Sequence, residues 1–175
     1  VSELQQQSAS NGSLANILTK LGDLYSASEN YPQAINLYSR AIELKRSDIF
    51  FTSSEEPSFA WQMIEIGNLF YRLRDYKLAE DAFKKASDYF ESVNDQKGVI
   101  TAINNIGLCR LNDNKPQEAY DRFVQMLRLA KKINDPSRIY SSTTYIGISL
   151  AALGRYDEAI RILEADQPGL QSPDE

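Results

Sequence analysis

Apolar residues follow one another along most of the chain at intervals of three and four residues, and short polar breaks interrupt them. Ala79, Phe83 and Ala86 show this spacing, which places them on one face of a helix. The breaks Asn94-Asp95 and Asn134-Asp135-Pro136 lie 40 residues apart and contain residues that end helices. The pattern predicts first helices near 14–28, 58–73, 97–112 and 137–153, paired with second helices near 31–47, 76–93, 116–133 and 156–165.

A repeat underlies these helix pairs. An apolar residue followed by glycine recurs every 40 residues, and one more copy lies 45 residues further upstream. The four glycines are Gly22, Gly67, Gly107 and Gly147. Twelve residues after each glycine stands an alanine, and four residues later a large apolar residue. These positions are Ala34 and Tyr38, Ala79 and Phe83, Ala119 and Phe123, and Ala159 and Leu163.

Glycine inside a helix is about 1 kcal/mol less favourable than alanine, so four glycines at one register need a physical reason. We expect the reason to be a close crossing of two helix backbones, with glycine on the first helix and alanine on the second. The large residues are then expected to fill the gaps between neighbouring hairpins. One hairpin leaves an apolar face uncovered, and stacking of the next hairpin covers it.

The spacing resembles that of the tetratricopeptide repeat family, whose units carry W-x2-L-G-x2-Y and then A-x3-F. The second copy shows it as Met63-x2-Ile66-Gly67-x2-Phe70, followed by Ala79-x3-Phe83. The resemblance implies an all-α fold, a right-handed superhelical solenoid of antiparallel helix pairs. It places four repeats within an array over 14–166, at about 15–48, 60–93, 100–133 and 140–166. The 40-residue period exceeds the usual 34, and longer helices are the simplest explanation.

The segments outside the repeats carry weaker signals. Residues 1–13 are expected to form a linker or a frayed helix end, and 167–175 a disordered tail. The longer first spacing predicts a loop near 48–56, ended by a capping box of Ser53 and Glu56 before the next helix. No helix follows Ile160 and Leu163, which suggests a truncated array or a homodimer contact through the C-terminal end.

The composition argues against catalysis. The chain has 0 His and 1 Cys, so it offers no imidazole base, no Ser-His-Asp or Cys-His pair and no intrachain disulfide. No phosphate-binding loop or metal-ligating cluster appears in the sequence, so we expect no enzyme activity, no cofactor and no metal. Cys109 follows a repeat glycine and is expected to be a small core residue.

The charge and the absence of long apolar runs bear on partners and location. The net charge of -5 disfavours nucleic acid, which needs a basic surface. No stretch is apolar enough to insert into a membrane, so a soluble segment is expected, with the cytoplasm favoured over the periplasm and the compartment left open. The chain begins with Val1 rather than Met, which suggests a piece of a longer protein.

In the family, the first helix of each pair lines the concave surface of the superhelix. The resemblance therefore implies a groove that binds a peptide or protein segment. The predicted groove residues are Trp61, Asn68, Tyr71, Arg72, Asn104, Asn105, Leu108, Asn112, Thr144 and Tyr145. Ile64 occupies an inward position of the same kind.

The asparagines carry the chemical part of this prediction. An amide both donates to and accepts from a peptide backbone, so a row of asparagines can hold an extended segment with little regard to its sequence. Asparagine is also common at the positions of Asn68 and Asn105 in the family, whatever the ligand, and Trp61 has an alternative role in packing between helices. The positions that form a cationic clamp in chaperone-binding members hold no Lys or Arg here, which argues against that ligand.

Two functional hypotheses follow. The first is a non-catalytic scaffold that binds a peptide or protein segment in the concave groove. The alternative is a sensory or regulatory segment of a larger bacterial signalling protein, of the histidine kinase or nucleotide cyclase type.

Overall fold

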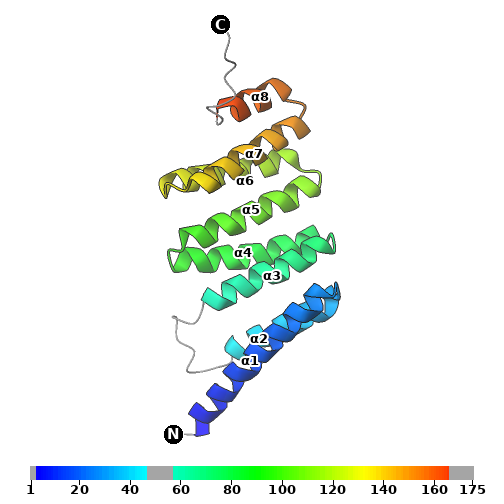
Figure 1. Ribbon diagram of the computed structural model, residues 1–175, viewed down its shortest axis with the longest axis vertical. Helices are drawn as coiled ribbons and strands as arrows, with labels where there is room; N and C mark the ends of the chain where they lie inside the picture. Colours follow the sequence, from blue (N-terminus) through cyan, green and yellow to red (C-terminus); the bar gives the residue numbers. More distant parts are fainter. Residues whose placement is uncertain (1–2, 47–56, 166–175) are drawn as a thin grey trace. The chain divides into compact units, whose positions relative to one another are not determined.

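The computed structural model describes residues 3–46 and 57–165, and within these ranges the secondary structure is entirely α-helical (Figure 1). The helices are α1 (Glu3–Ala27), α2 (Tyr31–Arg46), α3 (Pro57–Arg72), α4 (Tyr76–Ser92), α5 (Gln96–Asn112), α6 (Pro116–Lys132), α7 (Pro136–Ala152) and α8 (Tyr156–Ala165). The predicted loop near 48–56, its capping box and the tail 167–175 lie outside the described residues.

The chain divides into two compact units, Val1–Ala86 and Ser87–Glu175, and α4 begins in the first and ends in the second. In the first unit α1 packs against α2, and α3 packs against the first part of α4. In the second unit α5 packs against α6, α6 against α7, and α7 against α8. Successive helices run in opposite directions within each unit (Figure 1). The predicted fold class, an all-α array of antiparallel helix pairs, is confirmed.

The turns explain the length of the repeat. Arg74, Asn94, Asn114, Asn134 and Gly154 all have positive φ and follow one another at intervals of 20 residues. After each of them the chain closes the preceding helix with a bond from a backbone N–H to the carbonyl five residues earlier, such as Asp95 N to Phe90 O at 2.8 Å. This is the Schellman ending of a helix. Helices of 16 or 17 residues therefore alternate with turns of three, and the prediction of longer helices is confirmed for α3 to α7.

The aspartates after two of these turns start the next helix. The side chains of Asp95 and Asp135 accept hydrogen bonds from the backbone N–H of Gly98 (3.0 Å) and Arg138 (3.1 Å). Each carboxylate thus satisfies one of the N–H groups that a helix start leaves without an intrahelical partner. The predicted breaks at Asn94-Asp95 and Asn134-Asp135-Pro136 are confirmed, because one residue ends a helix and the next caps the following one.

The repeat glycines do not serve a crossing of two bare backbones, and this expectation was wrong. A methyl group on Gly22 would lie 2.7 Å from Cε1 of Tyr38, and one on Gly107 would lie 2.6 Å from Cε1 of Phe123. Gly67 meets Phe83 in the same way, and Gly147 meets Leu163. Each large side chain therefore lies on the glycine of its own hairpin rather than only filling a gap between hairpins. The glycine provides the space that the ring occupies.

The core of each unit is built around these rings. Tyr38 is buried with Ile42, Ile66 and Leu69 in the first unit. Phe90, Ile100, Phe123 and Ile146 are fully buried in the second. Cys109 is also buried there, so the prediction that it is a core residue is confirmed. Burying side chains of this size contributes about 1.5–3 kcal/mol each.

The predicted helix boundaries agree with the structure to within about two residues, with one exception. Helix α1 begins at Glu3 rather than near residue 14. Its first part is rich in Gln, Ser and Asn, so it shows no apolar period that would have predicted a regular helix.

The contact between Gly107 and Phe123 can be tested by the pair of variants Gly107→Ala and Gly12→Ala. Gly12 lies in α1 with nothing within 4 Å of an added methyl group, whereas a methyl group on Gly107 would lie 2.6 Å from the fully buried ring of Phe123. We expect Gly107→Ala to lower the free energy of unfolding by about 1–3 kcal/mol through overpacking. Gly12→Ala should raise it by up to about 1 kcal/mol through helix propensity. Urea denaturation measures both, and a stable Gly107→Ala variant would contradict the contact.

The N-cap at Asp135 makes stability depend on pH. The hydrogen bond from the backbone of Arg138, followed by that from its side chain, lowers the pKa of Asp135 below its usual value. A group whose pKa is lowered in the folded state stabilises the protein at pH values above its unfolded-state pKa, here about 3.9. This stabilisation is lost as the pH falls through the folded-state pKa. We therefore expect Asp135→Ala to have a lower Tm than the parent chain at pH 7, with the gap narrowing below about pH 4. A gap that does not change with pH would contradict the role of the carboxylate.

Candidate functional site

Four of the predicted groove residues lie on α3, in the first unit, but at its two ends. Trp61 is near the start of the helix and is 42% exposed, while Asn68 and Tyr71 are half-buried near its end. Arg72 is exposed, and its guanidinium lies 5.7 Å from the centre of the Tyr31 ring and donates to its hydroxyl at 3.3 Å. This hydrogen bond raises the pKa of Arg72. Trp61 is thus separated from the other three by roughly two to three turns of helix.

Other contacts explain the half-burial at that end of α3. The rings of Tyr71 and Tyr76, the first residue of α4, pack edge to face with their centres 5.7 Å apart. Ile64, which was expected to face the groove, is buried. The prediction for Ile64 was therefore wrong, because its side chain belongs to the core.

A hollow of about 520 Å³ lies between α1 and α3, next to Trp61 and within the first unit. Its lining consists of polar and charged side chains together with two aromatic rings. The residues are Asn16, Thr19, Lys20, Asp23, Tyr38, Trp61, Gln62 and Glu65. Only Trp61 among them belongs to the predicted groove residues.

The hollow carries two carboxylates, Asp23 from α1 and Glu65 from α3, and Tyr38 from α2 contacts the first of them. The hydroxyl of Tyr38 donates to Oδ1 of Asp23 at 2.6 Å. Burial raises the pKa of Tyr38, and the hydrogen bond and charge of Asp23 and the charge of Glu65 raise it further. The repeat tyrosine therefore has two roles, since its ring lies on Gly22 and its hydroxyl fixes the position of the Asp23 carboxylate.

Gln62, which lines the same hollow, carries an unsatisfied acceptor. Its side chain is only 7% exposed, and its Nε2 donates to Oγ1 of Thr19 at 2.8 Å. The single proton of the Thr19 hydroxyl goes to the carbonyl of Ala15 at 2.9 Å, so the hydroxyl can only accept from Gln62. The orientation of the amide is thereby fixed, and its Oε1 has no hydrogen-bond partner among the described residues. A buried acceptor without a partner lowers stability by about 1–3 kcal/mol, which calls for an explanation.

In the second unit the predicted residues lie on α5 and α7. Asn104 and Asn105 are half-buried on α5, and Nδ2 of Asn104 donates to Oδ1 of Asn105 at 3.3 Å. Oδ1 of Asn104 is buried without a partner among the described residues. As at Gln62, an acceptor is left over next to the surface of a first helix.

The remaining predicted residues of the second unit mostly bind their own helix or the core. Asn112 donates to the carbonyl of Leu108 at 2.9 Å, and Thr144 donates to that of Tyr140 at 3.0 Å. The Tyr145 ring stacks on Phe123 with the ring centres 4.9 Å apart. Leu108 is half-buried on α5. The structure thus brings Asn104 and Asn105 together and gives Tyr145 a packing contact.

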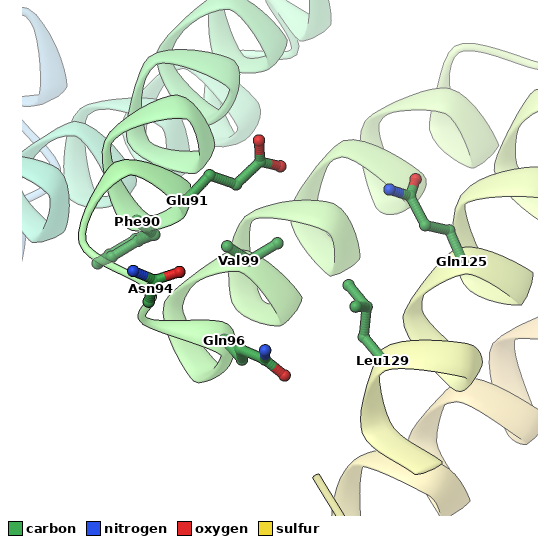
Figure 2. Close-up of a pocket in the computed structure, with 7 residues that line it drawn as sticks. All are labelled: Phe90, Glu91, Asn94, Gln96, Val99, Gln125 and Leu129. Carbon is green, nitrogen blue, oxygen red and sulfur yellow. The ribbon is translucent and has the colours of Figure 1, made fainter. Parts of the chain in front are cut away.

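A second hollow of about 260 Å³ lies in the second unit, among the end of α4, the start of α5 and α6 (Figure 2). Figure 2 shows Glu91 and Gln125 on opposite sides of it. Its other lining residues are Phe90, Asn94, Gln96 and Leu129. None of these belongs to the predicted site, because the spacing of the repeat points to the surface of the first helices.

Apolar side chains are exposed on the first and last described helices. Leu14, Ile17, Leu21 and Leu24 recur at intervals of three and four residues on α1, and all are exposed. On α8, Ile160 and Leu163 are exposed as well. The α8 residues are those of the predicted homodimer contact, which stays a prediction, and the α1 stripe was not predicted.

The described residues contain no group of three or more metal-ligating side chains close enough to hold a metal ion. Among the same residues, no helix has the length and apolar character needed to cross a membrane.

Residues 14–48, which correspond to α1 from Leu14 onward and α2, match the family model of the tetratricopeptide repeat. The chain carries a tetratricopeptide repeat. No curated protein matches the chain in sequence. This match agrees with the predicted family over one repeat, and the solved structures that resemble the chain share its fold.

Three of these structures illustrate the likeness. Aspartyl phosphate phosphatase F of Bacillus subtilis is similar at a TM-score of 0.75 and 16% identity, over 95% of this chain and 40% of that one. The tetratricopeptide repeat domain of Arabidopsis FLU is similar at 0.59 and 20%, over 66% and 94%. The Rap conjugation gene regulator of plasmid pLS20, solved with the Phr* peptide, is similar at 0.70 and 19%, over 85% and 40%. The chain thus spans 40% of the phosphatase and of the Rap regulator, and the likeness concerns the fold.

The Gln62–Thr19 pair can be tested for a structural role with the double variant Thr19→Val/Gln62→Met, which keeps the shapes of both side chains. Replacing both partners of a buried hydrogen bond by apolar groups is close to neutral, and here it also removes an unsatisfied oxygen. We expect the free energy of unfolding to fall by no more than about 0.5 kcal/mol, or to rise. A loss above about 1.5 kcal/mol in urea denaturation would show that the pair is kept for stability.

Proposed function

We propose that the chain is a non-catalytic interaction scaffold that binds a peptide or protein segment along the concave groove of the repeat array, on the surface of its first helices. The supporting observation is that in each unit a first helix carries a buried acceptor with no partner among the described residues. Oε1 of Gln62 lies on α3 and Oδ1 of Asn104 lies on α5. A backbone N–H or a side-chain donor of a bound segment would satisfy such oxygens.

One of the solved structures that resemble the chain supports the same function. The Rap regulator was solved in complex with the Phr* peptide, so this fold can bind a peptide. Interfaces of peptides with helical repeats use extended surfaces rather than a single deep pocket. The half-buried asparagines Asn68, Asn104 and Asn105 suit an extended segment, because each amide can both donate and accept.

The alternative, a sensory or regulatory segment of a larger signalling protein, has its own support. The chain aligns with only 40% of the aspartyl phosphate phosphatase and of the Rap regulator, which are larger proteins. A segment of this kind would bind its ligand on the same surface and change the activity of an attached part. The exposed Ile160 and Leu163 on α8 would then contact either that part or a second copy of the chain.

Three baits in a pull-down from an extract of the source cells test the proposal. The first is the chain itself, the second carries Asn68→Ala, Tyr71→Ala and Asn105→Ala, and the third carries Lys85→Ala and Lys132→Ala, which are exposed on second helices. Circular dichroism and Tm should first show that all three fold alike. We expect a partner that is retained by the first and third baits and reduced at least roughly tenfold on the second, as for the loss of a few interface residues of about 1 kcal/mol each. A partner that all three hold equally would move the site away from the first helices.

A further inference from the structure

We propose that the hollow between α1 and α3 is a subsite for one arginine side chain of the bound segment. This inference rests on the proposed function, since it names the chemistry of one position in the ligand. It depends on residues of the first unit only, and its principal residues are Asp23, Trp61, Gln62 and Glu65.

Two hydrogen-bond donors of the hollow are in use, whereas two of its acceptor groups can accept further hydrogen bonds. Nε2 of Gln62 donates to Thr19, and the hydroxyl of Tyr38 donates to Asp23. Oε1 of Gln62 lacks a partner among the described residues, and the carboxylate of Asp23 can accept more than the one hydrogen bond it receives from Tyr38. Glu65 adds a second exposed carboxylate on α3. A ligand that complements this set must bring several donors.

The charges of the hollow favour a cation. Its lining contains two carboxylates, Asp23 and Glu65, and one ammonium group, Lys20. Asp23 is held in place by the 2.6 Å bond from Tyr38, so it does not have to be ordered when a ligand binds. The raised pKa of Tyr38, caused by burial and then by Asp23 and Glu65, is consistent with a negative potential there.

The exposed ring of Trp61 favours a guanidinium over an ammonium. Trp61 stands at the edge of the hollow with 42% of its surface exposed. A guanidinium is planar, carries five N–H donors and stacks on aromatic faces, whereas a lysine ammonium is compact and strongly hydrated. An arginine side chain brings both the planar face that stacks on an aromatic ring such as Trp61 and the several donors that the carboxylates of Asp23 and Glu65 accept. A site with this set of groups would distinguish arginine from a neutral side chain of the same shape.

The experiment uses Trp61 as the reporter, because it is the one tryptophan in the chain. The indole N–H signal in a ¹H–¹⁵N spectrum is followed while the full chain is titrated with an acetylated and amidated peptide, Gly-Ser-Arg-Ser-Gly. Two further peptides replace the arginine with citrulline, which is neutral and nearly isosteric, or with glutamate. We expect the arginine peptide to bind at least roughly tenfold more tightly than the citrulline peptide, as for the loss of charge-assisted hydrogen bonds.

Variants then assign the effect to the hollow. Asp23→Asn/Glu65→Gln keeps the size of both side chains and should weaken the arginine peptide at least roughly tenfold. The control Glu43→Gln/Asp81→Asn makes the same change in net charge at exposed positions of α2 and α4 and should leave binding unchanged. Lys20→Gln removes the competing cation and should tighten binding. Matching Tm values confirm that the variants fold.

Three results would overturn the proposal. One is equal binding of the arginine and citrulline peptides. The second is preferential binding of the glutamate peptide that is lost in Lys20→Gln, which would make the hollow an anion site. The third is the absence of any shift of the Trp61 signal with all three peptides. None of these results decides the proposed function, because Asn68, Tyr71 and Asn105, which the pull-down tests, do not line the hollow.

Discussion

The contact between a glycine on the first helix of a pair and a large side chain on the second determines how closely the two helices approach. Gly22 lies under Tyr38, Gly67 under Phe83, Gly107 under Phe123 and Gly147 under Leu163. In each pair the glycine side is flat and the other side supplies the volume, and in the three aromatic pairs the ring of Tyr38, Phe83 or Phe123 is buried. This contact fixes the distance between the two helices of a pair, and with it the positions of the side chains on their outer faces. The surface of the first helices depends on this packing, as the position of the Tyr38 hydroxyl beside Asp23 shows.

Much of the fold could be predicted from the sequence, because the local signals and the packing signals agree. The Asn-Asp pairs are both the end of one helix and the cap of the next, so the breaks at residues 94 and 134 were visible in the residues themselves. The recurrence of glycine revealed the repeat but not the reason for it. Whether a glycine makes room for a backbone or for a ring depends on which atoms approach it, and spacing alone does not show this.

The candidate site was harder to predict, because its chemistry arises between residues far apart in the sequence. The amide of Gln62 is fixed by Thr19, which precedes it by 43 residues, and the oxygen left unsatisfied follows from that contact. In the sequence, Gln62 is one of several polar residues in a largely apolar helix and nothing singles it out. The family resemblance placed Trp61, Asn104 and Asn105 on the right helices, yet it did not show that Tyr145 stacks on Phe123 or that Thr144 and Asn112 bind their own helix.

A double-mutant cycle on Gly107 and Phe123 tests the packing claim most directly. In the parent chain a methyl group on Gly107 meets a buried ring, whereas in a Phe123→Ala background the same methyl group enters empty space and also favours the helix. The account predicts that Gly107→Ala changes sign between the two backgrounds, lowering the free energy of unfolding in the first and raising it in the second. The coupling energy should be about 1–4 kcal/mol, which combines the loss in the first background with the gain in the second. An equal effect of Gly107→Ala in both backgrounds would show that the ring is not the reason for the glycine.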